Sequence, residues 1–445
     1  MFAPFDETKA RQVCLKMMED LERDCCEWTG MFGALVCQDA AGNEVVLRAY
    51  SGSYEGSWKR DGWAPPLFDE EKYKAAILPN DKKIHELSEI PANESPEQKA
   101  ARDKERLALC NETLQKIYSL YSFCCFDQKW RTFADISNGK LLPTGTGDCS
   151  APKLLSEAFS KNLLPVSMAE FYWGKPNSRL VPKTFYPPCD EKCSFILPAI
   201  LGLKIIYRDQ NILVVDKPSG LLSVPGRGPE KQDCVVTRAR RLFPGMMEQP
   251  SVHRLDMDTS GLMVLAFDDE SHRALNAQFE KRLVKKNYVA VLDGVIKEQE
   301  GRVELKHRVD LENRPRQILD DFYGKLAVTE WKRLRVWTRR DGAGKERKAT
   351  SVLFTPLTGR THQLRVAAAF ALGAPIVGDN LYGREEESVG NVEGRACAAS
   401  ARTKNHCLSS DGASGRLLLH ACDLVFAHPI TGQEMRFHSE PDFAY

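Results

Sequence analysis

The sequence lacks the long apolar runs, the export signal and the cysteine spacing that mark several large classes of protein. No run of about 18 apolar residues occurs, so we expect no membrane span. The first residues, MFAPFDETKARQ, contain no apolar stretch of the kind that begins a secretory signal. The 14 cysteines are scattered and do not follow the spacing of a small disulfide framework. We therefore predict reduced thiols and a cytoplasmic location.

The sequence also lacks a large excess of charge of either sign, with 62 Lys+Arg against 61 Asp+Glu. The charge is divided unevenly, because residues 201–445 hold 37 Lys+Arg against 32 Asp+Glu and the remainder is slightly acidic. This basic excess permits a polyanionic partner for the C-terminal part but does not require one. With 42% hydrophobic and 28% charged residues, the composition is that of an ordinary globular protein.

A change of pattern near residue 200 predicts two parts. Residues 1–200 are predicted to form an N-terminal α/β extension, which begins with a helix followed by strand, turn and strand. Residues from about 69 to 135 are highly charged, with opposite charges four residues apart, and predict an exposed helical arm, either one long helix or a helical hairpin. Its candidates for contact with a nucleic acid are Lys99, Arg102, Lys104 and Arg106. Neighbouring acidic residues nearly cancel these bases, which favours a solvated helix over such a contact.

Residues 201–445 contain short β-branched or aromatic runs, with two helical patterns among them and no strict βαβ rhythm. This arrangement predicts an α+β sheet domain. Residues from about 383 to 416 are polar and rich in Gly and Ser, which predicts a flexible insertion between ordered elements.

The stretch SVHRLDMDTSGLMVLA places Arg254 and Asp256 directly before an apolar run. A buried carboxylate without a partner is costly, so such a residue is usually either paired or functional. Taken alone, the pair is more often a structural ion pair, and Tyr288 in a strand more often packs a sheet. Three other stretches must therefore be considered with this one: ILVVDKPSGLLSVPG, KKNYVAVLDG and GRTHQLRVAAAFALGAPIVGDNLYG.

Together these stretches resemble the RluA family of pseudouridine synthases over about residues 202–445. The HRLD-x-x-TSGL block is long, and the KPSGLLSVPG and GRTHQLRV blocks fall at compatible distances on either side. The resemblance is greatest to members that modify both tRNA and large-subunit ribosomal RNA. It implies a mixed, mostly antiparallel sheet with a central catalytic cleft, the pseudouridine synthase fold. It also implies an isomerase that detaches uracil at N1 and reattaches it through C5, with no cofactor.

The resemblance also implies roles for particular residues. Asp256 matches the catalytic aspartate, and Arg365 matches the arginine that keeps this carboxylate ionised. Tyr288 matches the tyrosine that lines the pocket and stacks on the uracil, and that is the family's candidate for taking the C5 proton. Arg254 matches the residue that fills the gap left when the target nucleotide flips out. Supporting positions are Lys217, Pro218 and Leu364.

One position departs from the family pattern, since the family usually has His directly after the LRV of the third block and this chain has Ala367. The implied partner is RNA, either a tRNA anticodon stem-loop, large-subunit ribosomal RNA, or both. We expect a monomer with no membrane partner. An alternative is a catalytically silent RNA-binding or RNA-chaperone protein, against which the intact Asp256, Tyr288 and Arg365 argue.

A second alternative concerns the cysteines of residues 138–200. Cys149 in GTGDCSAPK, followed by Cys189 and Cys193 in PPCDEKC, is similar to the thiolate set of a zinc nucleobase deaminase. The pattern departs from that set because C-x3-C replaces C-x2-C, and because Ala151 stands where such enzymes carry a glutamate beside the first ligand. We therefore predict no metal site here and ordinary thiols.

Overall fold

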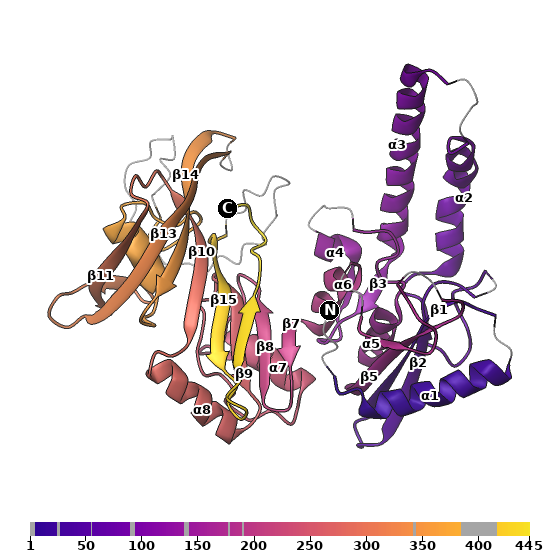
Figure 1. Cartoon of the computed structure of the whole chain (residues 1–445), viewed down its shortest axis with the longest axis horizontal. Helices are drawn as coiled ribbons and strands as arrows, with labels where there is room; N and C mark the ends of the chain where they lie inside the picture. Colours follow the sequence, from indigo (N-terminus) through magenta and orange to yellow (C-terminus); the bar gives the residue numbers. More distant parts are fainter. Residues whose placement is uncertain are drawn as a thin grey trace. The chain divides into compact units, whose positions relative to one another are not determined.

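The computed structural model describes residues 5–24, 27–54, 56–89, 94–137, 142–176, 179–188, 191–340, 344–383 and 416–445. The chain divides into two compact units (Figure 1). The first comprises Met1–Arg208 and Arg241–Pro244, and the second comprises Asp209–Arg240 and Gly245–Tyr445. The division after Arg208 falls several residues beyond the boundary expected from the sequence. The expected flexible insertion lies almost wholly outside the described residues.

The first unit is built on a four-stranded antiparallel sheet in the order β2-β1-β5-β6. Its strands are β1 (Gly30–Gln38), β2 (Glu44–Tyr50), β5 (Leu164–Trp173) and β6 (Phe185–Tyr186). Helices α1 (Thr8–Arg23) and α5 (Ser150–Ser160) cover its two faces, because neighbouring side chains of a strand point to opposite sides. Phe32 of β1 packs into the cluster that contains α1, whereas Gly33 lies against α5.

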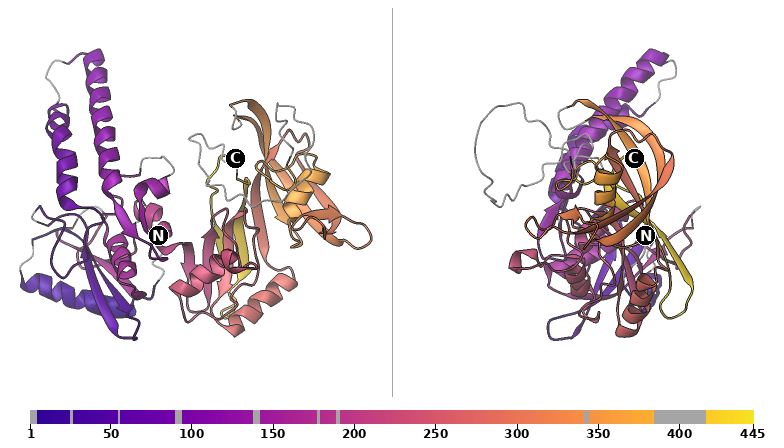
Figure 2. Two further views of the ribbon diagram at one scale, coloured as in Figure 1. Left: turned by 180° about the vertical axis from the view of Figure 1, so that it is seen from behind. Right: turned by 90° about the vertical axis from the view of Figure 1, so that its left-hand side faces the viewer.

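A helical hairpin projects from this sheet (Figures 1 and 2). It consists of α2 (Glu70–Glu86) and α3 (Pro96–Leu120), which pack against each other. The helical segment was expected to reach about residue 135, but α3 ends at Leu120. The next residues form a short hairpin of β3 (Ser122–Cys124) and β4 (Trp130–Thr132), followed by α4 (Phe133–Ser137). Aromatic and cysteine side chains from Tyr121 to Phe126 are buried, which favours an extended segment in the core over an exposed helix. The unit ends with α6 (Cys193–Leu201) and β7 (Lys204–Arg208).

The second unit contains the strand order β12-β11-β13-β14-β10-β15-β9-β8, with β16 paired to β15. The strands are β8 (Ile212–Lys217), β9 (Ser260–Ala266), β10 (Lys285–Asp293), β11 (Glu300–Val309), β12 (Gln317–Leu319), β13 (Lys325–Arg340), β14 (Glu346–Pro356), β15 (Leu419–Ala427) and β16 (Glu434–His438). Of these pairings, β9 with β15 is parallel and the others are antiparallel. The sheet is therefore mixed and mostly antiparallel, and the fold is α+β, as predicted.

The parallel contact between β9 and β15 depends on Gly261. This residue has a φ of +116°, and a Cβ atom here would lie 2.3 Å from the carbonyl oxygen of Ala421. Glycine permits both the positive φ and the close approach of the two backbones. Because β9 begins four residues after Asp256, this contact also determines where the preceding loop leaves the sheet.

The helical segments of the second unit are short. They are η1 (Pro229–Lys231), α7 (Val235–Leu242, of which the last two residues are grouped with the first unit), α8 (Asp269–Glu280), and α9 (Gln363–Val366), which continues into the π-helical turn η2 (Ala367–Ala371). Ala367, the position that departs from the family pattern, is 2% exposed and belongs to the core cluster beneath β10 and β14. None of the helices in the described residues is long and apolar enough to cross a membrane.

Candidate active site

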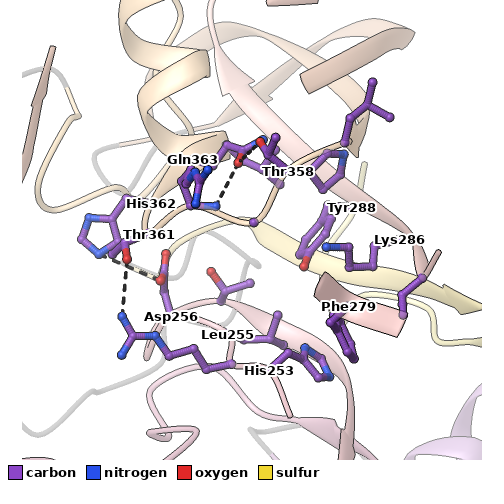
Figure 3. Close-up of a pocket in the computed structure, with 18 of the residues that line it drawn as sticks. His253, Leu255, Asp256, Phe279, Lys286, Tyr288, Thr358, Thr361, His362 and Gln363 are labelled. Atoms are coloured by element: carbon purple, nitrogen blue, oxygen red, sulfur yellow. Dashed lines mark hydrogen bonds and ion pairs between the residues drawn. The ribbon is translucent and has the colours of Figure 1, made fainter. Parts of the chain in front are cut away.

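The second unit contains a cavity of about 830 Å³. Its wall is formed by parts of three segments, residues 252–259, 279–288 and 355–365, together with Leu419. The HRLD stretch, the KKNY strand and the GRTHQLRV stretch, which are far apart in the sequence, therefore meet around one space (Figure 3).

Asp256 lies on the loop before β9, and its carboxylate faces the cavity (Figure 3). Hydrogen bonds fix the residues that precede Asp256 in the sequence. The Ser223 hydroxyl donates to the carbonyl of Leu255 over 2.6 Å and accepts from the Leu255 amide over 3.0 Å. The Val264 amide donates to Nε2 of His253 over 3.0 Å. The side chain of Asp256 is 23% exposed, so a constrained loop presents a partly accessible carboxylate.

Arg365 provides the cation nearest to this carboxylate among the described residues, with Nη1 3.8 Å from Oδ2 of Asp256. Its other nitrogens are held by Asp379, because Nε donates to Oδ2 over 2.8 Å and Nη2 donates to Oδ1 over 2.6 Å. Burial opposes the charge of Arg365, but the hydrogen bonds and charge of Asp379, followed by the charge of Asp256, raise its pKa. The guanidinium is therefore a permanent cation aimed at Asp256 from a fixed position.

Asp379 was not identified as a site residue from the sequence. Its side chain is fully buried, and Oδ1 also accepts the backbone amides of Leu381 and Tyr382. Tyr382 in turn shares a 2.8 Å hydrogen bond with Nδ1 of His362, whose Nε2 lies 4.0 Å from Asp256. The only sequence signal for this arrangement was the GDNLYG segment within the third stretch, which followed Arg365 closely but carried no assigned role.

Tyr288 lies on β10 and lines the cavity (Figure 3). Its side chain also packs against the core cluster of the unit. Burial, and then the charge of Asp256, raises the pKa of Tyr288, so its hydroxyl stays protonated at neutral pH. The residue therefore presents a neutral ring to the cavity. A flat aromatic wall of this kind is a surface on which a planar base can stack.

Arg254 and Leu364 occupy different parts of the cavity. The Arg254 side chain is exposed, and its Nη2 donates to the hydroxyl of Thr361 over 3.4 Å. Among the described residues the guanidinium makes no other hydrogen bond, so it can reorient toward a bound molecule. Leu364 is 6% exposed, so most of its side chain belongs to the core, and it lines the cavity from α9.

Lys217 does not line the cavity but supports the loop that does. Its buried ammonium donates to three carbonyl oxygens, those of Pro218 over 3.0 Å and of Leu221 and Met257 over 2.7 Å each. Burial lowers the pKa of Lys217 to about 7. The Lys-Pro turn is thereby tied to the residue that follows Asp256, so Lys217 and Pro218 contribute through loop structure.

The charge of the cavity wall is mainly positive. Its acidic residues are Asp256 and Glu280. Its basic residues are Arg254, Arg282, Lys285, Lys286, Arg360 and Arg365. Arg365 is balanced by the buried Asp379, but the other five bases exceed the acids and give a surface suited to a polyanion.

The cysteines of the N-terminal part lie outside this cavity. Cys149 is half-buried at the start of α5, Cys193 is buried at the start of α6, and Cys189 lies outside the described residues. Within the part of the chain that the structure describes, no three His, Cys, Asp or Glu side chains are grouped so that they could hold a metal ion.

Comparisons with known proteins place these features beside characterised relatives. A family model described as RNA pseudouridylate synthase matches residues 211–370. The dual-specificity RNA pseudouridine synthase RluA of Haemophilus influenzae is 41% identical over 241 residues, which are 54% of this chain and 94% of the relative. The RluA enzyme of Escherichia coli K12 has the same identity and coverage. A solved structure of human RNA pseudouridylate synthase domain containing 1 is 27% identical, with a TM-score of 0.40, over 54% of this chain and 84% of that chain.

Proposed function

The chain belongs to the RNA pseudouridylate synthases, and we propose that its cavity isomerises uridines of tRNA and large-subunit ribosomal RNA with Asp256 as the reacting carboxylate. The enzyme is an isomerase. The bond between N1 of uracil and C1′ of ribose breaks, and C1′ then bonds to C5. The C5 proton leaves and N1 gains a proton, so the reaction balances without an oxidant, a reductant or a second substrate.

The single observation that carries this proposal is the position of Asp256 beside Arg365 on the cavity wall. At 3.8 Å the two groups form an ion pair but not a hydrogen bond. The cation therefore lies within Coulombic reach of the carboxylate without occupying its oxygens. An ionised carboxylate with free lone pairs can act as a nucleophile toward the sugar or the base.

Tyr288 and Arg254 are proposed to hold the target nucleotide in place. The neutral ring of Tyr288 stacks on the uracil and keeps the detached base in the cavity between the two steps. If Tyr288 also takes the C5 proton, its own proton must first leave, since its raised pKa keeps the hydroxyl protonated. Arg254 is exposed and weakly held, which supports insertion into the space that the flipped nucleotide vacates.

The proposed RNA targets follow from the relatives and from the chemistry of flipping. The relatives are named dual-specificity synthases, which supports more than one RNA substrate. Loop uridines, as in a tRNA anticodon stem-loop or a ribosomal RNA hairpin, are already partly unstacked, and this lowers the cost of extrusion. The excess of basic residues on the cavity wall supports binding of the phosphates that flank the target uridine. We further propose that the chain acts as a monomer in the cytoplasm.

The test is an assay of the purified chain on total tRNA, on ribosomal RNA and on an anticodon stem-loop, with pseudouridine mapped at each position. We expect Asp256→Asn to lower the isomerisation rate at least about a thousandfold. The Kd for RNA should change less than about twofold, because binding depends on phosphate and shape contacts. Asp258→Asn, two residues away in the same loop, is the matched control and should remain active.

Two results would contradict the proposal in different ways. Turnover retained by Asp256→Asn would remove Asp256 from the mechanism while leaving the activity intact. A wild-type chain that binds these RNAs but converts no uridine, together with unchanged pseudouridine in RNA from a deletion strain, would favour the silent RNA-binding alternative.

A further inference from the structure

Lys286 is a cation of the cavity wall that the reaction chemistry above does not use. It lies on β10, two residues before Tyr288, and its side chain points into the same space (Figure 3). The residue is half-buried. Among the described residues its ammonium has no hydrogen-bond or ion-pair partner, and the charge contacts the Phe279 ring, 5.8 Å from its centroid. A partly desolvated, unpaired cation is costly in the free protein, which points to a partner that arrives with the substrate.

Lys286 is separate from the reacting charges. Asp256 has its own cationic neighbour in Arg365 and lies toward His362, whereas Lys286 lies on the other side of the cavity, beside Phe279 (Figure 3). Burial lowers the pKa of Lys286, and no carboxylate of the described residues forms an ion pair with its ammonium. The carboxylate that reacts and the ammonium that lacks a partner therefore do not neutralise each other.

The RNA substrate brings two kinds of acceptor near such a cation. One is the pair of uracil carbonyls, which are neutral, and the other is the backbone phosphate on either side of the flipped nucleotide, which is anionic. A hydrogen bond between two charged groups is roughly twice as strong as one between neutral groups. Lysine binds phosphate as a compact point charge. The anionic acceptor therefore compensates the cost of burying the ammonium better than the carbonyls do.

We propose that Lys286 forms a phosphate subsite on the cavity wall and binds the backbone phosphate next to the nucleotide that enters the cavity. The subsite rests on the proposed function, since it requires an RNA nucleotide in this cavity. It holds the phosphate equally in the ground state and the transition state, because the reaction moves bonds of the base and of C1′ and leaves the phosphate unchanged. Its loss therefore weakens RNA binding and leaves the rate at saturating enzyme almost unchanged.

The experiment compares Lys286→Met, Lys286→Arg and a control, Lys281→Met, in the full-length chain. Lys281 is exposed at the end of α8 and does not line the cavity, so its loss measures the effect of one positive charge on the same unit. For a stem-loop RNA we expect Lys286→Met to raise Kd at least about tenfold. It should also lower the slope of log Kd against log salt by about one. Lys286→Arg should retain most of the affinity, and thermal unfolding verifies that each variant is folded.

A second measurement identifies the acceptor. Stem-loops are prepared with one uncharged methylphosphonate linkage, placed on the 5′ or the 3′ side of the target uridine. At one of these positions the modification should raise the Kd of the wild type about as much as Lys286→Met does. The same modification should raise the Kd of Lys286→Met little further, because the contact is already lost. Fully additive losses at both positions would overturn the phosphate subsite. An unchanged Kd with a lower saturating rate would show instead that Lys286 acts on the reacting base.

The outcomes also separate the subsite from the proposed function. A wild-type chain that shows the Lys286-dependent coupling but isomerises no uridine contradicts the proposed function alone. A chain that isomerises uridine without the coupling contradicts the subsite alone. A chain that binds none of these RNAs contradicts both.

Discussion

At the residue scale, the guanidinium of Arg365 serves two carboxylates that differ in exposure. Asp379 is fully buried and accepts two charged hydrogen bonds, whereas Asp256 is 23% exposed and stands 3.8 Å away. The buried partner holds the guanidinium in one orientation, and the remaining nitrogen is left for the carboxylate at the cavity. The reacting group can therefore be approached by a substrate without disturbing the ion pair that positions its cation.

Replacement of Asp379 by Asn should separate these two roles. An amide keeps the size of the side chain but leaves the charge of Arg365 largely uncompensated in the core, so we expect the free energy of unfolding to fall by about 3 kcal/mol. The isomerisation rate should fall because Arg365 is no longer held toward Asp256, while the Kd for RNA stays the same. Urea unfolding and single-turnover kinetics measure the two effects.

Asp442→Asn is the matched control, since Asp442 is 70% exposed and pairs with Arg416 over 2.6 Å. Its loss should cost less than about 1 kcal/mol. Equal stability of Asp379→Asn and the wild type would mean that the buried pair does not hold Arg365 in place.

At the element scale, Arg102 joins the two helices of the α2–α3 hairpin. Its Nη1 donates to the carbonyl of Leu87 over 2.6 Å, and its Nε and Nη2 donate to the carboxylate of Glu94 over 2.7 and 3.0 Å. These contacts link the end of α2 to the residues before α3. Arg102 was considered a candidate for contact with RNA, but its donors already have partners within the hairpin. Lys99, Lys104 and Arg106 are exposed on α3.

Arg102→Met should therefore loosen the hairpin and leave the chemistry unchanged. We expect faster hydrogen exchange of backbone amides in the first turns of α3, because the bonds that fix its start are lost. The isomerisation rate should not change. Arg106→Met removes an exposed charge from the same helix and should leave the exchange as it is. A variant of Arg102 that exchanges like the wild type but loses affinity for RNA would support the RNA-gripping role instead.

At the scale of the whole molecule, we expect the catalytic chemistry to be confined to one of the two units. The relatives from Haemophilus influenzae and Escherichia coli are covered over 94% of their length by 54% of this chain. All the residues assigned to the cavity belong to the second unit. The first unit has its own sheet and core, and it contributes none of the described cavity residues.

A fragment of residues 201–445 should fold and isomerise uridine in an isolated stem-loop. Since a domain with its own core can fold alone, we expect a rate within about threefold of the intact chain. The assay uses both the stem-loop and full-length tRNA, so that a loss on full-length tRNA alone would assign RNA contact to the first unit. A folded fragment that fails on both substrates would contradict the confinement of the chemistry to the second unit.

More of the second unit than of the first could be predicted from the sequence, and the reason is physical. In the second unit the pattern of short strands and helices predicted the α+β fold, and four motifs in a family's order named Asp256, Tyr288 and Arg365 for one site. In the first unit local patterns predicted the initial helix and β1–β2, but not the pairing of β5 with β1, because that pairing joins residues more than a hundred positions apart. Asp379 and Lys286 were not assigned a role from the sequence, for a related reason. Asp379 is identified by its hydrogen bonds to Arg365, and Lys286 by the lack of an ion-pair partner among the described residues. Such contacts depend on the three-dimensional fold and cannot be inferred from spacing along the chain.

The close backbone contact at Gly261 determines how the second unit tolerates mutation at this position. A Cβ atom at this position would lie 2.3 Å from the carbonyl oxygen of Ala421. Every single-base change in a glycine codon that alters the amino acid adds a Cβ atom. Such a change would force β9 away from β15 and displace the loop that carries Asp256. We therefore expect every missense change in this codon to impair the enzyme, although the residue that it encodes does not line the described cavity.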